Sequence, residues 1–213
     1  MFDLDGVLLD SEQVWDGARR DLVAQTGGRW TEEAPTDMLG MSAPEWSRYV
    51  VEQLHVPLTP EQVNAAVVEA MLREYDERLP LLPGARAAVE RMAERWPLGL
   101  ASSSNRPLIE LALELSGLAR LFGAVVSSEE VPRGKPAPDV YLEAARRLDV
   151  DAGACAAVED SENGIRSAHG AGMRVLAIPN PTYPPDDDAL ALADVVLPSI
   201  RELDVRAVAP DAA

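Results

Sequence analysis

The chain has 213 residues, a formal net charge of −17, 47% hydrophobic residues and a single cysteine. This length suits one medium-sized domain, or a domain that carries a smaller insertion. Nucleic acid and anionic membranes are poor partners for so acidic a chain, because both are negatively charged. One cysteine excludes an intrachain disulfide, and without a signal-peptide pattern we expect a cytoplasmic protein.

Helical patterns dominate residues 11–81. Apolar residues at helical spacing follow Ser11, and capping boxes begin at Ser42 and Thr59, each before a further apolar stripe. No strand pattern interrupts this region. A purely helical block of this size predicts an inserted module, which we place at residues 13–81.

From residue 82 onward, short apolar runs alternate with helical patterns. The runs that we predict as strands are residues 98–101, 124–126, 155–158, 175–178 and 194–197. Strands that alternate with helices indicate βαβ units and a parallel sheet. We therefore expect an α/β core with a doubly wound, Rossmann-like, mainly parallel sheet, formed by residues 1–12 and 82–213.

Polar residues follow several of these runs, at the sheet edge where ligands bind in open parallel sheets. They are Asp3, Asp5, Ser102, Lys135, Glu159 and Asp160. Carboxylates are the ligands that Mg²⁺ prefers, and a cation, a hydroxyl and an ammonium group can together neutralise phosphate oxygens. Lys135 is the only lysine beside eighteen arginines, which indicates either a need for a compact charge or codon usage. The set suits a Mg²⁺-bound phosphoryl group.

Four segments resemble motifs of the haloacid dehalogenase (HAD) superfamily, in the branch of small phosphatases and β-phosphoglucomutase-like enzymes. They are FDLDGVLLDSE (2–12), LASSSN (100–105), GKPAPD (134–139) and VEDSENG (158–164). The resemblance covers the whole chain and implies that the helical block is an α-helical cap. Only two residues precede Asp3, which is short for a central strand. We therefore expect either that the numbered chain begins downstream of the natural start or that this strand is truncated.

The resemblance implies a role for each matching residue. Asp3 resembles the nucleophile that forms an aspartyl-phosphate, and Asp5 resembles the general acid/base. Ser102 would donate a hydrogen bond to the transferring phosphoryl group. Lys135 would pair with Asp3 and with the phosphoryl oxygens.

The same resemblance implies the cofactor Mg²⁺. Its ligands would be Asp160, an oxygen of Asp3 and the backbone carbonyl of Asp5, with Glu159 supporting it directly or through water. These positions match the family's motifs in this sequence and are expectations about the folded chain.

Four further residues are candidates for substrate binding. Ser103 and Asn105 flank Ser102 and either contact the substrate or cap the next helix. Trp15 is expected to pack in the helical block or to face the cleft. Ser42 lies in a loop that either contributes to specificity or simply begins a helix.

We expect a Mg²⁺-dependent phosphatase that acts on a small phosphorylated metabolite such as a sugar phosphate, as a monomer or a homodimer. One alternative is a β-phosphoglucomutase-like hexose-phosphate mutase. Related mutases carry a histidine and an arginine where this chain has Trp15 and Ala43, and alanine cannot bind a second phosphate. Another alternative is a catalytically idle HAD-like binding or regulatory protein, although every expected site residue is present.

Overall fold

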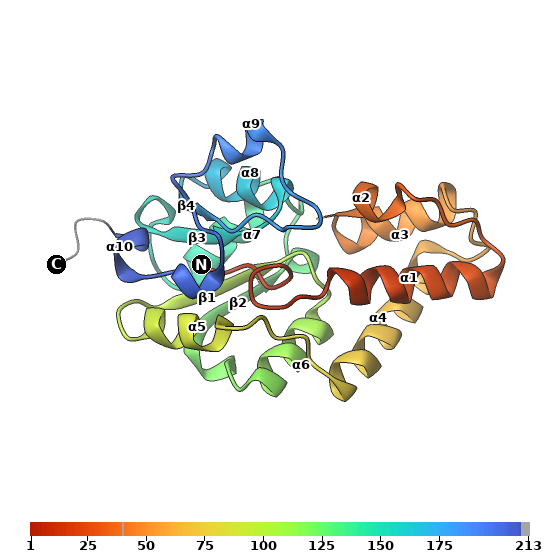
Figure 1. The fold of residues 1–213 in the computed structure, drawn as a ribbon, viewed down its shortest axis with the longest axis horizontal. Coiled ribbons are helices and arrows are strands. Elements are labelled where there is room, and N and C mark those ends of the chain that lie inside the picture. Colours follow the sequence, from red (N-terminus) through yellow and green to blue (C-terminus); the bar gives the residue numbers. More distant parts are fainter. Residues whose placement is uncertain (40, 210–213) are drawn as a thin grey trace.

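The computed structural model describes residues 1–39 and 41–209, and its core is a parallel sheet (Figure 1). Strand β1 (Leu98–Ser102) pairs with β2 (Phe122–Ser127), and β3 (Ala156–Glu159) pairs with β4 (Arg174–Ala177), which pairs with β5 (Val195–Val196). Phe2 joins the two groups through parallel bridges to Leu100 and Val158. The order across the sheet is therefore β2, β1, Phe2, β3, β4, β5, and the predicted α/β class is confirmed.

Two apolar clusters lie on opposite faces of the sheet, and successive strand residues contribute to them in turn. Leu100 of β1 packs in one cluster and Ala101, its neighbour, packs in the other, because successive side chains of a strand point to opposite faces. Buried residues of α5 (Ala85–Ala93) and α6 (Arg106–Ser116) belong to the first cluster. Those of α7 (Asp139–Arg147) and α8 (Glu162–Gly170) belong to the second. Helices therefore cover both faces of the sheet, as a doubly wound fold requires.

The core also contains two short helices near the C-terminus. These are α9 (Asp187–Leu190) and α10 (Val205–Val208). Helix α9 begins after a segment rich in proline and aspartate, where the Asp186 carboxylate accepts a hydrogen bond from the backbone N–H of Ala189. None of the helices in the described ranges has the length and apolar character needed to cross a bilayer.

Four helices lie together at one end of the molecule (Figure 1), and we call them the helical lobe. They are α1 (Glu12–Thr26), α2 (Ala34–Met38), α3 (Ala43–Glu52) and α4 (Pro60–Glu77). The capping boxes predicted at Ser42 and Thr59 begin α3 and α4. The short helix α2 was not predicted, because five residues are too few to display a helical period.

The helical lobe joins the core through two adjacent segments. Leu9 forms an antiparallel bridge with Leu81. The Asp10 N–H donates to the carbonyl of Pro80, and the Leu82 N–H donates to that of Leu8, both at 2.8 Å. The chain therefore leaves the core and returns to it at the same place.

Candidate active site

The loop after Phe2 brings the first aspartates to the carboxyl ends of the strands. Gly6 has a φ of +75°, in the left-handed region that favours glycine, and its N–H donates to the carbonyl of Leu9 at 2.7 Å. A Cβ atom at Gly6 would collide with the carboxylate of Asp160. Position 6 therefore requires glycine for two reasons: the left-handed turn and the close approach of Asp160 to the loop.

Lys135 is the buried centre of the site. Its side chain reaches the sheet from the loop before α7, and the residue is only 3% exposed. The ammonium nitrogen lies 2.9 Å from Asp3 Oδ1 and 2.6 Å from Glu159 Oε1. Burial alone would lower the pKa of Lys135, but Asp3 and Glu159 outweigh it and raise that pKa above its usual range. The lysine therefore stays charged beside the predicted nucleophile.

Three carboxylates cluster beside this lysine. Asp3, Glu159 and Asp160 each offer an oxygen, and these oxygens lie within 4.8 Å of one another. Burial raises the pKa of Asp3 to about 8, with Lys135 opposing the shift and Glu159 adding to it. Burial and the same acidic neighbours raise the pKa of Asp160 well above its usual value. A divalent cation would relieve this repulsion, because it favours the ionised carboxylates.

One oxygen of this cluster has neither a hydrogen bond nor an ion pair among the described residues. Asp160 Oδ1 is buried and accepts no hydrogen bond there, and an unsatisfied buried acceptor is costly. A hard cation bound by carboxylate oxygens would satisfy it. The donor set therefore fits Mg²⁺.

Glu159 is bound on both of its carboxylate oxygens. Oε1 accepts from Lys135 and, at 2.6 Å, from the Tyr141 hydroxyl, while Oε2 accepts from the backbone N–H of Asp160 at 3.1 Å. The residue is completely buried. These contacts make Glu159 the group that fixes Lys135, and its direct contact with a metal stays a prediction.

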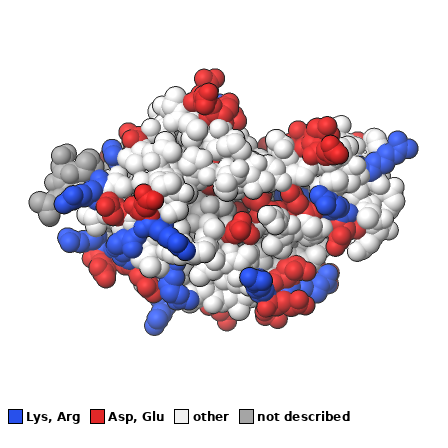
Figure 2. Space-filling view, viewed as in Figure 1, with Lys and Arg blue, Asp and Glu red and all other residues white. Residues whose placement is uncertain are grey.

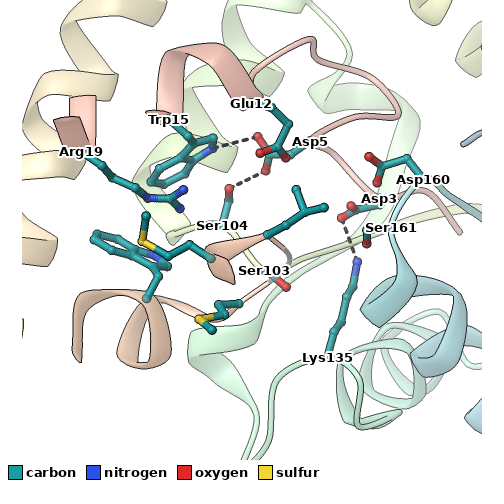
Figure 3. Close-up of a pocket in the computed structure, with 14 residues that line it drawn as sticks. Asp3, Asp5, Glu12, Trp15, Arg19, Ser103, Ser104, Lys135, Asp160 and Ser161 are labelled. Atoms are coloured by element: carbon teal, nitrogen blue, oxygen red, sulfur yellow. Dashed lines mark hydrogen bonds and ion pairs between the residues drawn. The ribbon is translucent and has the colours of Figure 1, made fainter. Parts of the chain in front are cut away.

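Asp5 points toward the helical lobe (Figure 3). Its carboxylate accepts hydrogen bonds from the Ser11 hydroxyl, from Trp15 Nε1 at 3.2 Å and from the Ser104 hydroxyl. The Tyr75 hydroxyl lies 3.5 Å away. Asp5 is thus held at the junction of core and helical lobe, where a leaving group could reach it.

The three consecutive serines that begin at the last residue of β1 have different surroundings. Ser102 is fully buried, its Oγ accepts from the Ser104 N–H at 3.0 Å, and it does not line the cavity beside Asp3. Ser103 lines that cavity, and its buried hydroxyl has no hydrogen-bond partner among the described residues. The hydroxyl proton of Ser102 is still available to an acceptor, so its phosphate-binding role stays a prediction.

A cavity of about 50 Å³ lies between the core and the helical lobe. Several of the predicted site residues line it, namely Asp3, Asp5, Trp15, Ser103, Lys135 and Asp160. Two candidates for substrate binding do not. Ser42 caps α3 through Glu45, and the Asn105 amide donates to Asn64 at 3.1 Å and to Glu129 at 2.7 Å.

Two charged residues that the sequence reasoning missed also line the cavity: Glu12 and Arg19 of α1. Burial raises the pKa of Glu12 to about 7, and Asp5 adds to the shift. The sequence contains a signal for both residues. Glu12 lies three residues before Trp15 and Arg19 lies four residues after it, which places all three on one face of a helix. Ala43 offers no cation for a second phosphate, as a mutase would need, but Arg19 supplies a cation on the lobe side of the cavity.

Comparisons with known proteins identify the family of the chain. A family model described as haloacid dehalogenase-like hydrolase matches residues 1–172. Hexitol phosphatase B of Escherichia coli K12 is 39% identical over 210 residues, which cover 95% of this chain and 92% of that protein. A probable pseudouridine-5'-phosphatase of Drosophila melanogaster is 33% identical over 85% of this chain and 81% of its own.

A solved structure has the same overall arrangement. CbbY of Rhodobacter sphaeroides in complex with phosphate superposes with a TM-score of 0.86 and 27% identity, covering 97% of this chain and 96% of its own. The predicted family is confirmed: the chain belongs to the haloacid dehalogenase-like hydrolases, in the branch of β-phosphoglucomutase-like enzymes and small-molecule phosphatases.

Proposed function

We propose that this phosphatase depends on Mg²⁺ and hydrolyses a small phosphorylated sugar or polyol through an aspartyl-phosphate on Asp3. The observation that carries the proposal is the buried cluster in which Lys135 lies 2.9 Å from Asp3, beside the unpartnered oxygen of Asp160. Relatives named as hexitol phosphatase and fructose-1-phosphate phosphatase support the substrate class.

In the first step, a carboxylate oxygen of Asp3 attacks phosphorus, and the bond from phosphorus to the alcohol oxygen breaks. Lys135 reduces the repulsion between the Asp3 carboxylate and the approaching phosphoryl oxygens. Glu159 holds the ammonium group in place, since it contacts Lys135 at 2.6 Å and is itself fixed by Tyr141.

Asp5 is the general acid and base of the proposed mechanism. It protonates the leaving alcohol, then takes a proton from the water that hydrolyses the acyl phosphate. The hydrogen bonds from Ser11, Trp15 and Ser104 fix the orientation of its carboxylate. Asp5 therefore transfers protons at the lobe side of the cavity, away from the Asp3–Lys135 pair.

Asp3, Asp160 and the Asp5 backbone carbonyl would hold Mg²⁺. When bound, the cation neutralises charge on the phosphoryl oxygens and on the clustered carboxylates. A bound cation favours the ionised forms of Asp3 and Asp160. Without the cation, the pKa values of both carboxyl groups are raised.

The helical lobe is the cap in this proposal, formed by residues 13–81, and the core consists of residues 1–12 and 82–213. The cavity of about 50 Å³ is much smaller than the roughly 300 Å³ or more of small-molecule sites. A phosphorylated sugar therefore enters only when the cap moves away, and closure then excludes bulk water from the acyl phosphate.

The first prediction tests the nucleophile. Asp3→Asn removes the attacking carboxylate, and phosphate release from glucitol 6-phosphate with Mg²⁺ should fall by roughly 10³-fold or more. Asp10→Asn is the matched control, because Asp10 is an exposed aspartate of the same motif; it should keep the wild-type rate.

Chelation of divalent cations should abolish the wild-type activity, and added Mg²⁺ should restore it. Wild-type turnover by Asp3→Asn would disprove the mechanism. ³¹P NMR of hexose phosphates gives an independent check, because isomerisation without free phosphate would identify a mutase instead.

A further inference from the structure

Arg19 is a buried cation held between two tryptophans. The residue is only 6% exposed, although it lies on a helix of the outer lobe. Its guanidinium carbon lies 4.9 Å from the ring centre of Trp15 and 5.0 Å from that of Trp46. The two rings meet edge to face at 5.9 Å. This packing fixes the plane of the guanidinium group before any ligand binds.

The guanidinium group donates no hydrogen bond to a described residue, although the carboxyl groups of Glu12, Asp16 and Asp5 lie close enough to act on its charge. Its Nε is buried without a hydrogen-bond partner there. The paired carboxylate, Asp16, has an oxygen 3.9 Å from Nη1, which is beyond hydrogen-bond distance, and its other oxygen accepts from the Tyr183 hydroxyl at 2.9 Å. Lys135, by contrast, has two carboxylates within 2.9 Å. A buried cation without acceptors is costly, so an acceptor supplied by a ligand would be bound strongly.

Arg19 and the Asp3–Lys135 pair line the same cavity from different sides (Figure 3). The cavity lining also includes the apolar side chains of Met38 and Met41, together with Trp46, which packs on Arg19. A substrate whose phosphoryl group lies at Asp3 therefore presents its leaving group to Arg19. The low polarity of this wall strengthens any charge-assisted hydrogen bond formed there.

We propose that Arg19 is a specificity determinant that binds a second anionic group, a carboxylate or a phosphate, on the leaving-group side of the substrate. This inference rests on the proposed phosphatase function. The Nε and Nη donors of a guanidinium form a fork that matches two oxygens of such an anion, whereas one neutral hydroxyl satisfies a single donor and brings no negative charge. Glu12 lines the same cavity, and burial raises its pKa to about 7, which reduces its repulsion of an anion near neutral pH.

The test compares esters that differ only in the second anion. The pairs are 3-phosphoglycerate and glycerol 3-phosphate, 6-phosphogluconate and glucitol 6-phosphate, and fructose 1,6-bisphosphate and fructose 6-phosphate. The first two pairs detect a carboxylate site and the third detects a phosphate site. Arg19→Gln should lower kcat/KM about 10- to 100-fold for the doubly anionic member of at least one pair, mainly through KM. The singly anionic partner should change less than about threefold, which also shows that the variant is folded.

Arg20→Gln is the matched control. Arg20 is the next residue of the same helix, is exposed and stacks on Trp30 at 5.4 Å, away from the cavity. Its substitution should leave kcat/KM unchanged for all six esters. Arg19→Lys keeps the charge but not the fork, so it should recover only part of the lost affinity.

Titration calorimetry in an Asp3→Asn background separates this inference from the proposed activity. There, Arg19→Gln should weaken binding of the doubly anionic ester at least about tenfold and spare its partner. If the wild type releases no phosphate while this difference in binding holds, the phosphatase mechanism fails and the inference stands. An equal loss for both members of every pair, or no loss for any, overturns the inference.

Discussion

At the scale of single residues, the site depends on a fixed lysine. The motif residues Asp3, Lys135 and Asp160 could be predicted from the sequence, because Asp3 and Asp160 follow apolar runs and Lys135 lies in a loop beyond one, at the same edge of a parallel sheet. Tyr141 could not, since its position in the apolar stripe of α7 is indistinguishable from core packing. Its hydroxyl donates to Glu159 at 2.6 Å, and its ring lies 5.1 Å below the Lys135 ammonium.

Tyr141→Phe should destabilise the fold by about 1–2 kcal/mol, because it removes a buried hydrogen bond to a charged group and keeps the ring. The measurement is urea unfolding with an unchanged m-value. Tyr49→Phe is the matched control, since its hydroxyl donates to Asp37 in an exposed contact, and it should cost no more than about 0.5 kcal/mol. Equal losses for the two variants would mean that the Glu159 contact contributes no special stability.

The serine triplet marks a limit of sequence reasoning at this scale. Ser102, Ser103 and Ser104 have identical side chains, and the backbone turn after β1 decides what each one contacts. Ser104 donates to Asp5 and Ser103 lines the cavity, while Ser102 lies beneath them. The motif located the segment correctly, but only the three-dimensional turn distinguishes its members.

At the scale of elements, α1 lines the cavity with Trp15, which was a candidate from the sequence, and with Glu12 and Arg19, which were not. The helix was expected from its apolar spacing, and its three- and four-residue intervals place Glu12, Trp15 and Arg19 on one face. Whether that face meets solvent or a cavity depends on how the lobe lies against the core. Such contacts between distant parts of the chain leave no periodic signal.

A loop of the core also reaches α1. The Tyr183 hydroxyl donates to Asp16 at 2.9 Å. This contact is present when the helical lobe is closed on the core, the arrangement in which the cavity is too small for a sugar phosphate. Tyr183→Phe removes this closing contact, so the closed state should be less populated and KM should rise about fivefold. Steady-state kinetics with glucitol 6-phosphate measure this change. Thr182→Ala, an exposed position in the same loop, should leave KM unchanged. A KM that stays constant or falls in Tyr183→Phe would mean that the contact does not favour closure.

At the scale of the whole molecule, charge governs encounter with ligands. The net charge is −17, and Figure 2 shows acidic and basic groups scattered over a face that is otherwise uncharged. Such a surface attracts Mg²⁺ and repels phosphate esters at long range, and dissolved salt screens both effects.

Raising NaCl from about 20 to 200 mM should therefore favour encounter with the ester and disfavour binding of Mg²⁺. At saturating Mg²⁺, kcat/KM for a phosphate ester should rise about two- to fivefold, because screening weakens repulsion. The Mg²⁺ concentration that gives half-maximal activity should rise, because screening weakens attraction. A fall in kcat/KM at saturating Mg²⁺ would instead mean that local cations such as Arg19 and Lys135 dominate the encounter.

The bridge between Leu9 and Leu81 has a consequence for how such enzymes diversify. Because the chain leaves and re-enters the core side by side, a short turn after Leu9 would link the same two segments as a hairpin, with little loop-closure entropy. The stretch between Leu9 and Leu81 can be lengthened, shortened or exchanged as one continuous insertion without any change in the order of the strands. Selection can therefore change what the enzyme accepts by grafting one continuous piece of sequence, while Asp3, Lys135 and Asp160 keep their places.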